Sequence, residues 1–188
     1  MRCTNPPVIV VHSAAHATAA LTAAAETGRA VILASTPDAG IYGGPGWFRG
    51  LVAAAGRAAP QAQFLALLDC GDDAGAAQAA IRAGVEAIVF TGRADVAVRL
   101  FDIAARAGSR LLTIRPEPSL DLGDHFFATG SELLARCTQF LKGEAASRNS
   151  RKNRAGRGAV DASIPNETSQ RLSICRCWVG RPGKSDQS

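Results

Sequence analysis

The stretch AIRAGVEAIVFTG, residues 80–92, contains the end of a helical segment, a glycine and a short apolar run in direct succession. Glycine is favoured just past a helix because it adopts a left-handed backbone conformation without a Cβ clash. The apolar run has little alternation of polar and apolar residues, which is typical of a strand covered on both faces. The stretch therefore predicts a helix that ends near Gly84 and a buried strand over 87–91.

A similar succession occurs three more times along the chain, with Gly28, Pro60 or Gly108 after the helical segment. It is found in AAETGRAVILAS (24–35), GRAAPQAQFLALLDCG (56–71) and AARAGSRLLTIRP (104–116). Helices that alternate with short strands indicate βαβ units and a parallel sheet. The pattern predicts strands near 8–12, 31–35, 64–69, 87–91 and 111–114, and helices near 15–27, 46–58, 73–83, 95–107 and 130–143.

Five strands are too few to close a parallel barrel. The sequence therefore predicts an α/β domain over residues 1–144, built on an open five-stranded parallel sheet with helices on both faces. The alternative is a partial (βα) barrel that is completed by a homodimer. Alanine-rich helices with small exposed side chains would allow two subunits to pack closely.

From residue 145 onward the composition changes to Ser, Arg, Asn and Gly without periodicity, so we expect 145–188 to be a disordered basic tail. Acidic and basic residues balance over 1–142, so the formal net charge of +5 lies in residues 143–188. The tail is either functional or an unselected extension. Nucleic-acid binding through it is an alternative function, although only Trp178 could stack on bases.

The cysteine pattern and the apolar runs bear on the compartment. The cysteine number is odd, at 5, and no apolar run reaches membrane-spanning length. We therefore expect a cytoplasmic protein with reduced thiols and no membrane partner.

A glycine-rich stretch, DAGIYGGPGWFRG (38–50), follows the second predicted strand. One hypothesis is an anion cradle in which Gly44 and Gly46 expose backbone N–H groups and Arg49 supplies charge. The alternative is a long βα loop in which Trp47 and Phe48 anchor the next helix. The dinucleotide and P-loop motifs do not fit, because Arg49 replaces the third glycine and no lysine precedes Lys142.

Polar residues follow the predicted strands, and in a parallel sheet they would share one edge. This set comprises His12, Ser13, Thr36, Asp69, Thr91, Gly92, Arg93 and Arg115. Of these, His12 and Asp69 are predicted to act as a catalytic acid/base pair. The other residues are predicted to bind ligand, with Arg93 and Arg115 clamping an anion between their planar guanidinium groups.

Each of these predictions has a structural alternative. Asp72 or Asp73 could cap a helix, Arg93 could pair with Asp95, and Cys70 could be a packing residue instead of a nucleophile. The pair His12 and His16 fits a helix start better than a metal site. We predict no metal and no cofactor.

Over residues 64–115 the chain resembles a repeat of phosphate-binding (βα)-barrel proteins. The likeness rests on the stretch LALLDCGDDAGAAQAAIRAGVEAIVFTG (65–92). This stretch is similar to repeats in 2-keto-3-deoxy-6-phosphogluconate aldolase and thiamine phosphate synthase. The resemblance implies barrel-like architecture and an anion-binding edge. In the aldolases it would also imply a Schiff-base lysine on a later strand, which this sequence does not contain.

Taken together, these features predict a domain that binds a small anionic metabolite, phosphorylated or carboxylated, at the carboxyl ends of its strands. Whether such a domain also turns its ligand over stays open at this point. The alternative is a lyase- or isomerase-like enzyme of sugar-phosphate metabolism that uses Asp69 and His12.

Overall fold

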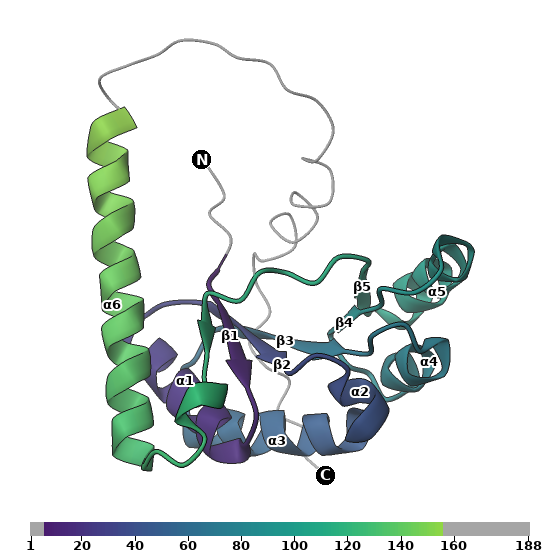
Figure 1. Ribbon diagram of the computed structural model, residues 1–188, viewed down its shortest axis with the longest axis horizontal. Helices are drawn as coiled ribbons and strands as arrows, with labels where there is room; N and C mark the ends of the chain where they lie inside the picture. The colour runs from purple at the N-terminus through teal and green to yellow at the C-terminus, as the bar shows by residue number, and fades with distance from the viewer. Residues whose placement is uncertain (1–5, 156–188) are drawn as a thin grey trace. The chain divides into compact units, whose positions relative to one another are not determined.

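The five predicted apolar runs form one parallel sheet in the computed structural model, which describes residues 6–155 (Figure 1). The strands are β1 (Val8–Val11), β2 (Val31–Ser35), β3 (Phe64–Asp69), β4 (Ala87–Val89), β5 (Arg110–Leu112) and β6 (Leu120–Asp121). Their order in the sheet is β5-β4-β3-β2-β1-β6. Every pairing is parallel, so the predicted parallel α/β sheet is confirmed.

The sixth strand, β6, is a feature that the sequence did not reveal. It consists of two residues, and its partners are Ile9 and Val10 of β1. A segment this short lies among prolines and acidic residues and gives no apolar run to detect. Its place beside β1 returns the chain across the whole sheet from β5, which lies at the opposite edge.

Helices connect the strands close to the predicted positions. They are α1 (Ala14–Thr27), α2 (Ala39–Tyr42), α3 (Gly44–Ala58), α4 (Ala74–Arg82), α5 (Ala94–Ala107), the short 3₁₀ helix η1 (Gly123–His125) and α6 (Gly130–Ala155). Gly28 and Gly108 end α1 and α5 in the left-handed conformation that the sequence pattern predicts. The Asp73 carboxylate accepts a hydrogen bond from the Ala76 N–H at 2.8 Å, so Asp73 is the helix cap that was expected at this position.

The helices pack on one face of the sheet. Ile9 of β1, Leu33 of β2 and Leu68 of β3 belong to the two buried clusters that contain the helix side chains. The residues on either side of each of them in the strand do not, so one face of the sheet packs against the helices. Figure 1 shows α1 and α3 along this side of the sheet. From β1 to β5, each strand is added to the sheet on the same side of the strand before it. Right-handed crossovers then place the connecting helices on one face. The sheet is therefore open and wound like a partial barrel, instead of carrying helices on both faces.

The glycine-rich stretch 38–50 is helical and does not form the long loop that was considered. Gly43 ends α2, and Pro45 occupies the first turn of α3, where a proline is favoured because the N–H of this position has no helical partner. Phe48 is buried at 1% exposure, as expected of an anchor, whereas Trp47 is 42% exposed. Only one of the two aromatic residues therefore anchors α3.

The last helix extends further than the sequence predicts. We expected it to end near residue 143, but α6 continues to Ala155. The predicted boundary of the tail at 145 therefore falls inside α6, and residues 156–188 lie outside the described part of the chain. None of the described helices is long and apolar enough to cross a membrane.

Candidate functional site

A small cavity lies on the face of the sheet opposite the helices. Its volume is about 70 Å³. The apolar lining residues are Val8, Val10, Ala34, Leu67 and Val89, and the polar ones are Ser35, Asp69, Arg115 and Asp121, with Pro37, Pro116 and Pro118 around them. The apolar residues come from strands β1 to β4, and most of the polar ones come from the ends of β2, β3 and β6. We call this end of the sheet, with the loops that follow the strands, the carboxyl edge.

Asp69 and Arg115 form a direct ion pair in the wall of this cavity. The Asp69 side chain is 4% exposed and lies at the end of β3, while Arg115 lies in the β5–β6 connection and is 42% exposed. Arg115 Nη2 donates to Asp69 Oδ1 at 3.0 Å, and its Nε donates to Asp69 Oδ2. The contact is bidentate, so it fixes the plane of the guanidinium group as well as its position.

Backbone groups hold the Asp69 carboxylate from its other side. Its Oδ1 accepts hydrogen bonds from the Asp38 N–H at 3.0 Å and from the Gly71 N–H at 2.9 Å. Burial is the largest influence and raises the pKa of Asp69, but the hydrogen bonds from Arg115, Asp38 and Gly71 outweigh it and leave that pKa below its ordinary value. Asp69 is therefore ionised at neutral pH, and the geometry suits a residue that holds Arg115 better than one that transfers protons.

Asp38 is a second carboxylate beside Arg115. Its Oδ1 lies 3.6 Å from Arg115 Nη2, and its backbone has a φ of 61°, a left-handed conformation that aspartate tolerates better than most residues. Gly71, with a φ of 53°, lies against it, and a Cβ added there would lie 2.2 Å from Asp38 Oδ1. The turn after β2 and the turn after β3 are thus fitted to one another around Arg115.

Ser35 and Cys70 have structural roles at the same edge. The Ser35 hydroxyl accepts a hydrogen bond from the Asp69 N–H at 2.9 Å and donates to the Thr36 carbonyl at 3.0 Å. Cys70 is fully buried, and burial, followed by the charges of Asp69 and Asp73, raises the pKa of its thiol to about 12. A thiol that stays protonated is a poor nucleophile, in agreement with the packing role considered for Cys70.

His12 has a different carboxylate partner from the one predicted. Its Nε2 lies 2.6 Å from Asp121 Oδ1, and Asp121 also accepts a hydrogen bond from the Gly123 N–H at 2.8 Å. A Cβ added at Gly123 would lie 2.8 Å from the His12 ring, so glycine is needed for this approach. Asp121 lines the cavity that Asp69 lines, but the structure joins His12 to Asp121 and not to Asp69.

Ser13 and His16 belong to the start of α1. The Ser13 hydroxyl accepts a hydrogen bond from the His16 N–H at 3.2 Å and so caps the helix. His16 is completely buried, and its Nδ1 accepts a hydrogen bond from the His12 N–H at 3.3 Å. Within residues 6–155, no group of three or more His, Cys, Asp or Glu side chains has the arrangement of a metal site.

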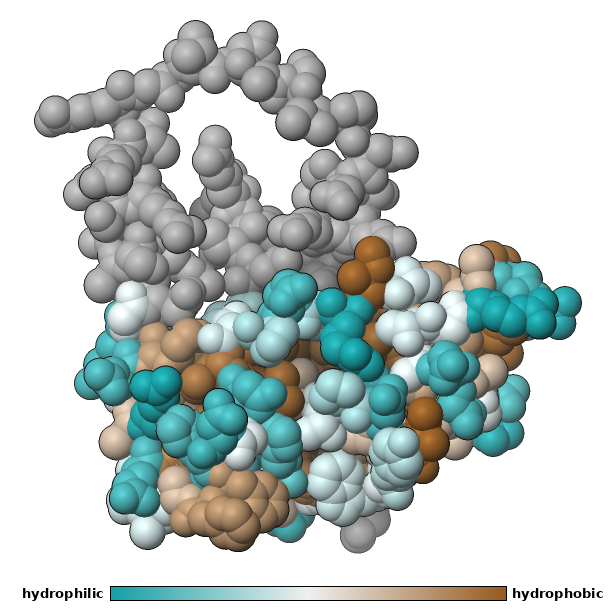
Figure 2. All heavy atoms as spheres, in the orientation of Figure 1, coloured by the Kyte–Doolittle hydropathy of each residue, from teal (hydrophilic) through white to brown (hydrophobic). Residues whose placement is uncertain are grey.

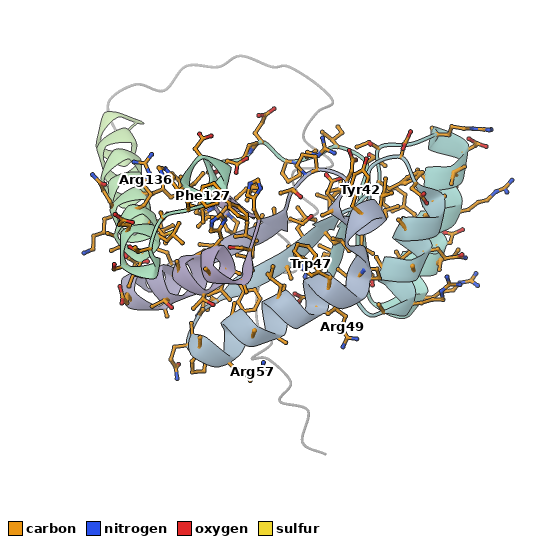
Figure 3. All side chains as sticks on the ribbon, turned by 60° about the horizontal axis from the view of Figure 1, so that its bottom comes forward. Tyr42, Trp47, Arg49, Arg57, Phe127 and Arg136 are labelled. Atoms are coloured by element: carbon orange, nitrogen blue, oxygen red, sulfur yellow. The ribbon has the colours of Figure 1, made fainter. Side chains whose placement is uncertain are left out.

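The remaining residues of the predicted site do not line the cavity. Arg93 is 80% exposed and makes two hydrogen bonds to Asp95, at 2.8 and 3.0 Å, as the structural alternative had it. Arg49 extends from α3 away from the sheet (Figure 3). None of the other five predicted positions lines the cavity: Thr36, Gly44, Gly46, Thr91 and Gly92.

No role at this edge was predicted for Asp38 or Asp121. Asp38 lies just beyond the end of the second predicted strand, so the sequence does place it next to the edge. Asp121 gave no such signal, because β6 has too few residues to show a periodicity. The counterpart of His12 could not be found before β6 was placed beside β1.

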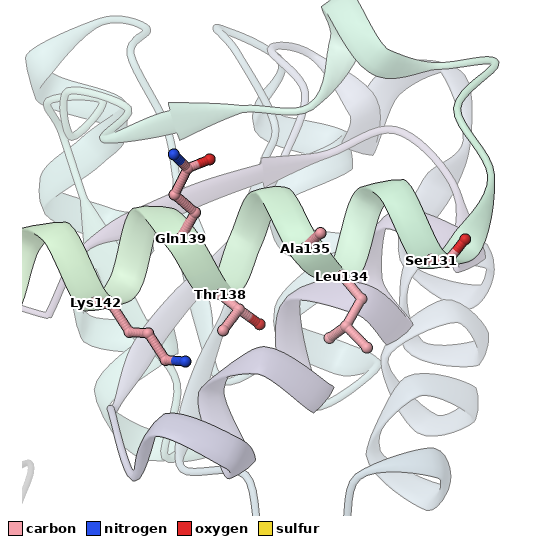
Figure 4. Close-up of a pocket in the computed structure, with 6 residues that line it drawn as sticks. All are labelled: Ser131, Leu134, Ala135, Thr138, Gln139 and Lys142. Carbon is pink, nitrogen blue, oxygen red and sulfur yellow. The ribbon is translucent and has the colours of Figure 1, made fainter.

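A larger but shallow hollow lies along α6 (Figure 4). Its volume is about 530 Å³, and its lining residues all come from this one helix: Ser131, Leu134, Ala135, Thr138, Gln139 and Lys142. It contains no pair of acidic and basic groups and lies on an exposed face. The hollow therefore lacks the convergent polar groups of a ligand site.

Exposed apolar side chains occur around the surface as well. The large ones within the described residues are Ile41, Tyr42, Trp47, Val98, Phe101, Ile103, Ile114, Phe126 and Phe127. On the face shown in Figure 2, brown hydrophobic surface alternates with teal hydrophilic surface. Phe127 is the most exposed of them at 96% and lies near the first turns of α6 (Figure 3).

Comparisons with known proteins found similarity among solved structures. No family model matches the chain, and no curated protein matches it. Among solved structures, the chain is similar to a "putative fructose-1,6-biphosphate aldolase" from Coccidioides immitis, with a TM-score of 0.48 and 19% sequence identity. The similarity covers 56% of this chain and 39% of the other, so this chain spans about two fifths of the length of that protein.

Proposed function

We propose that the domain binds a small hydroxylated metabolite that carries one carboxylate or phosphate group, with Arg115 as the partner of that group. The observation that carries the proposal is the bidentate contact between Asp69 and Arg115 in the wall of the cavity. Asp69 accepts hydrogen bonds from Nε and Nη2 of Arg115, which leaves the Nη1 group of Arg115 for a ligand. A guanidinium held in place before binding loses little side-chain entropy when a ligand arrives.

The local charges favour directed hydrogen bonds over long-range attraction. Asp38, Asp69 and Asp121 oppose the positive charge of Arg115 in and beside the cavity. An anion is therefore not drawn in by a positive field and depends on the geometry of the guanidinium. Hydroxyl groups on the ligand could donate to the carboxylate oxygens, which supports a hydroxylated compound over a simple anion.

The size of the cavity limits how much of the ligand enters it. A volume of about 70 Å³ is well below the several hundred Å³ of pockets that enclose a whole metabolite. It has room for the charged group and a few neighbouring atoms. The rest of the ligand would lie over the opening, at the ends of the strands.

The test is thermal unfolding of the full chain with glycerol 3-phosphate, glycerate, glycerol and acetate as probes. We expect the first two to stabilise the protein, by about 2.7 kcal/mol at one hundred times the dissociation constant. Glycerol lacks the anionic group and acetate lacks hydroxyl groups, so both should have a smaller effect. Arg115→Lys should abolish the stabilisation, because an ammonium group cannot make the planar contact.

Arg93→Ala is the matched control, since Arg93 lies at the same end of the sheet but pairs with Asp95 in solvent. The variant should respond to the probes as the unmodified protein does. Stabilisation that survives Arg115→Lys but disappears in Arg93→Ala would contradict the assignment of Arg115. An absence of any response to all four probes would contradict the proposed ligand class.

A second candidate function, proton transfer by His12, is favoured by the contact of 2.6 Å between His12 Nε2 and Asp121 Oδ1. A carboxylate that engages one ring nitrogen orients the imidazole and leaves the other nitrogen for a substrate. Histidine would take a proton from carbon next to a carbonyl group, while the electron pair moves onto the carbonyl oxygen. This is the first step of many lyase and isomerase reactions of sugar phosphates.

Proton transfer is testable by following dihydroxyacetone phosphate in D₂O by proton NMR. We expect the chain to accelerate the loss of the carbon-bound hydrogen next to the carbonyl group, and His12→Asn to abolish this acceleration. Asp121→Asn should retain part of it, because it disturbs only the orientation of the ring. Equal exchange with and without the protein would rule out this activity while leaving metabolite binding intact.

A further inference from the structure

We infer that His16 is an acid-sensitive latch, which holds the segment 119–127 against α1 while its ring is neutral and releases that segment when the ring takes up a proton. The segment contains β6 and η1 and is called the β6–η1 segment below. The inference is independent of the proposed ligand. It rests on the surroundings of His16 and on the short pairing of β6.

The hydrogen bond of His16 requires a neutral ring. His16 is 0% exposed, and its Nδ1 accepts the His12 N–H at 3.3 Å. A ring nitrogen can accept a hydrogen bond only when it carries no proton, so the ring hydrogen is assigned to Nε2. A proton on Nδ1 would remove this acceptor and place a ring N–H group against the His12 N–H.

The β6–η1 segment supplies the outer cover of His16. The Phe126 ring lies with its centroid 5.7 Å from that of His16 at an interplanar angle of 79°, and the His12 ring lies 5.8 Å away on another side. Phe126 itself is 51% exposed. On this side the buried imidazole is therefore separated from solvent by one aromatic ring.

The ionisable groups that face His16 come from three elements. They are His12 after β1, Asp121 of β6 and His125 of η1. Burial is the largest influence and lowers the pKa of His16, and His12 lowers it further, whereas the backbone of His125 and the charge of Asp121 raise it. The net result is a lowered pKa, so the folded surroundings favour the neutral ring.

The β6–η1 segment is the part of the sheet with the shortest pairing. β6 lies at the edge and pairs through Ile9↔Leu120 and Val10↔Asp121. Leu120 and Leu122 are buried and attach the segment to the core. An edge strand with two paired residues opens more readily than the interior strands, so it is the natural place for a local transition.

The direction of the pH effect follows from proton linkage. When the segment opens, His16 regains an ordinary pKa near 6.5 and binds a proton that the closed state does not bind. Opening is therefore favoured as the pH falls below about 6.5, by up to about tenfold per pH unit, until the lowered pKa of the closed state is reached. Because Asp121 belongs to β6, opening would also separate it from His12.

The test is amide hydrogen exchange of the full chain at pH 7 and pH 5.5, corrected for the intrinsic dependence of exchange on pH. We expect the protection of residues 119–127 to fall by up to about tenfold at the lower pH, while peptides from β3 and β4 keep theirs. His16→Asn retains an acceptor for the His12 N–H but cannot be protonated, so it should remove the difference. His125→Asn leaves His16 in place and should keep it.

A second measurement needs no variant and follows the histidine ring signals of the unmodified chain by NMR. We expect one histidine to stay neutral until the protection of the β6–η1 segment falls, and both changes to share one midpoint. Unchanged protection down to pH 5.5, an equal loss across the whole sheet, or an equal loss in His16→Asn would each overturn the inference.

Discussion

Replacing Asp69 by alanine is expected to lower the free energy of unfolding by about 1–3 kcal/mol, the cost of leaving buried hydrogen-bond donors without their acceptor. The carboxylate accepts four hydrogen bonds, two from Arg115 and one each from the backbone of Asp38 and Gly71. The substitution leaves these donors without their acceptor in a site that excludes most water. The turn after β2, the turn after β3 and the β5–β6 connection would all lose the carboxylate that they share.

Urea unfolding of the full chain measures this effect. Asp72→Ala is the matched control, because Asp72 lies three residues further along, is exposed and should change stability by less than about 0.5 kcal/mol. Asp69→Asn should fall between the two, since the amide keeps one oxygen acceptor but turns a donor toward Arg115. A loss of less than about 1 kcal/mol in Asp69→Ala would contradict the structural role of the buried Asp69 carboxylate.

The same carboxylate predicts a pH dependence. Because the pKa of Asp69 is lowered in the folded protein, its contribution is fully present above the unfolded value of 3.8 and is lost as the pH falls through the folded pKa. This loss occurs at a lower pH than the opening expected at His16. The two carboxyl-edge effects can therefore be separated in one titration of stability against pH, and Asp69→Ala should lose only the more acidic one.

Gly71→Ala is expected to destabilise the protein by about 3 kcal/mol, through two additive causes. The residue has a φ of 53°, which strains an alanine, and the added Cβ would lie 2.2 Å from Asp38 Oδ1. Asp38 would have to move away, and with it one of the two carboxylates beside Arg115. Thermal unfolding of the variant measures the sum of both causes.

Gly44→Ala separates the two causes. Gly44 has a φ of 73° but nothing lies within 4 Å of an added Cβ, so only the strain of about 1 kcal/mol should appear. The difference between the two variants then measures the contact with Asp38. Equal destabilisation by both substitutions would show that the turns after β2 and β3 are not fitted to one another.

The sequence was sufficient to predict the parallel sheet because its evidence is local. Gly28 and Gly108 end α1 and α5, and each is followed within a few residues by the apolar run that forms the next strand. The placement of the helices on one face depends instead on the order of the strands, which is a long-range property. The strand β6 was missed for a different reason, because its two residues give no apolar run.

The candidate site was predictable residue by residue but not in its pairings. The placement of Asp69 and Arg115 at one edge follows from the ends of β3 and β5, and the structure brings them into contact. His12 was expected to work with Asp69, but its carboxylate partner is Asp121 of β6. Arg93 is exposed and pairs with Asp95, two residues away, instead of turning toward the cavity.

The most direct test of the central claim, that Arg115 held by Asp69 is the contact for a ligand anion, is an NMR titration of the full chain with glycerol 3-phosphate. The account predicts that the Nε signal of Arg115 and the amide signals of Asp38 and Gly71 shift together along one saturation curve, while Arg93 does not respond. Shifts confined to Arg93 or to the hollow on α6, or no shift of Arg115 at saturating ligand, would contradict it.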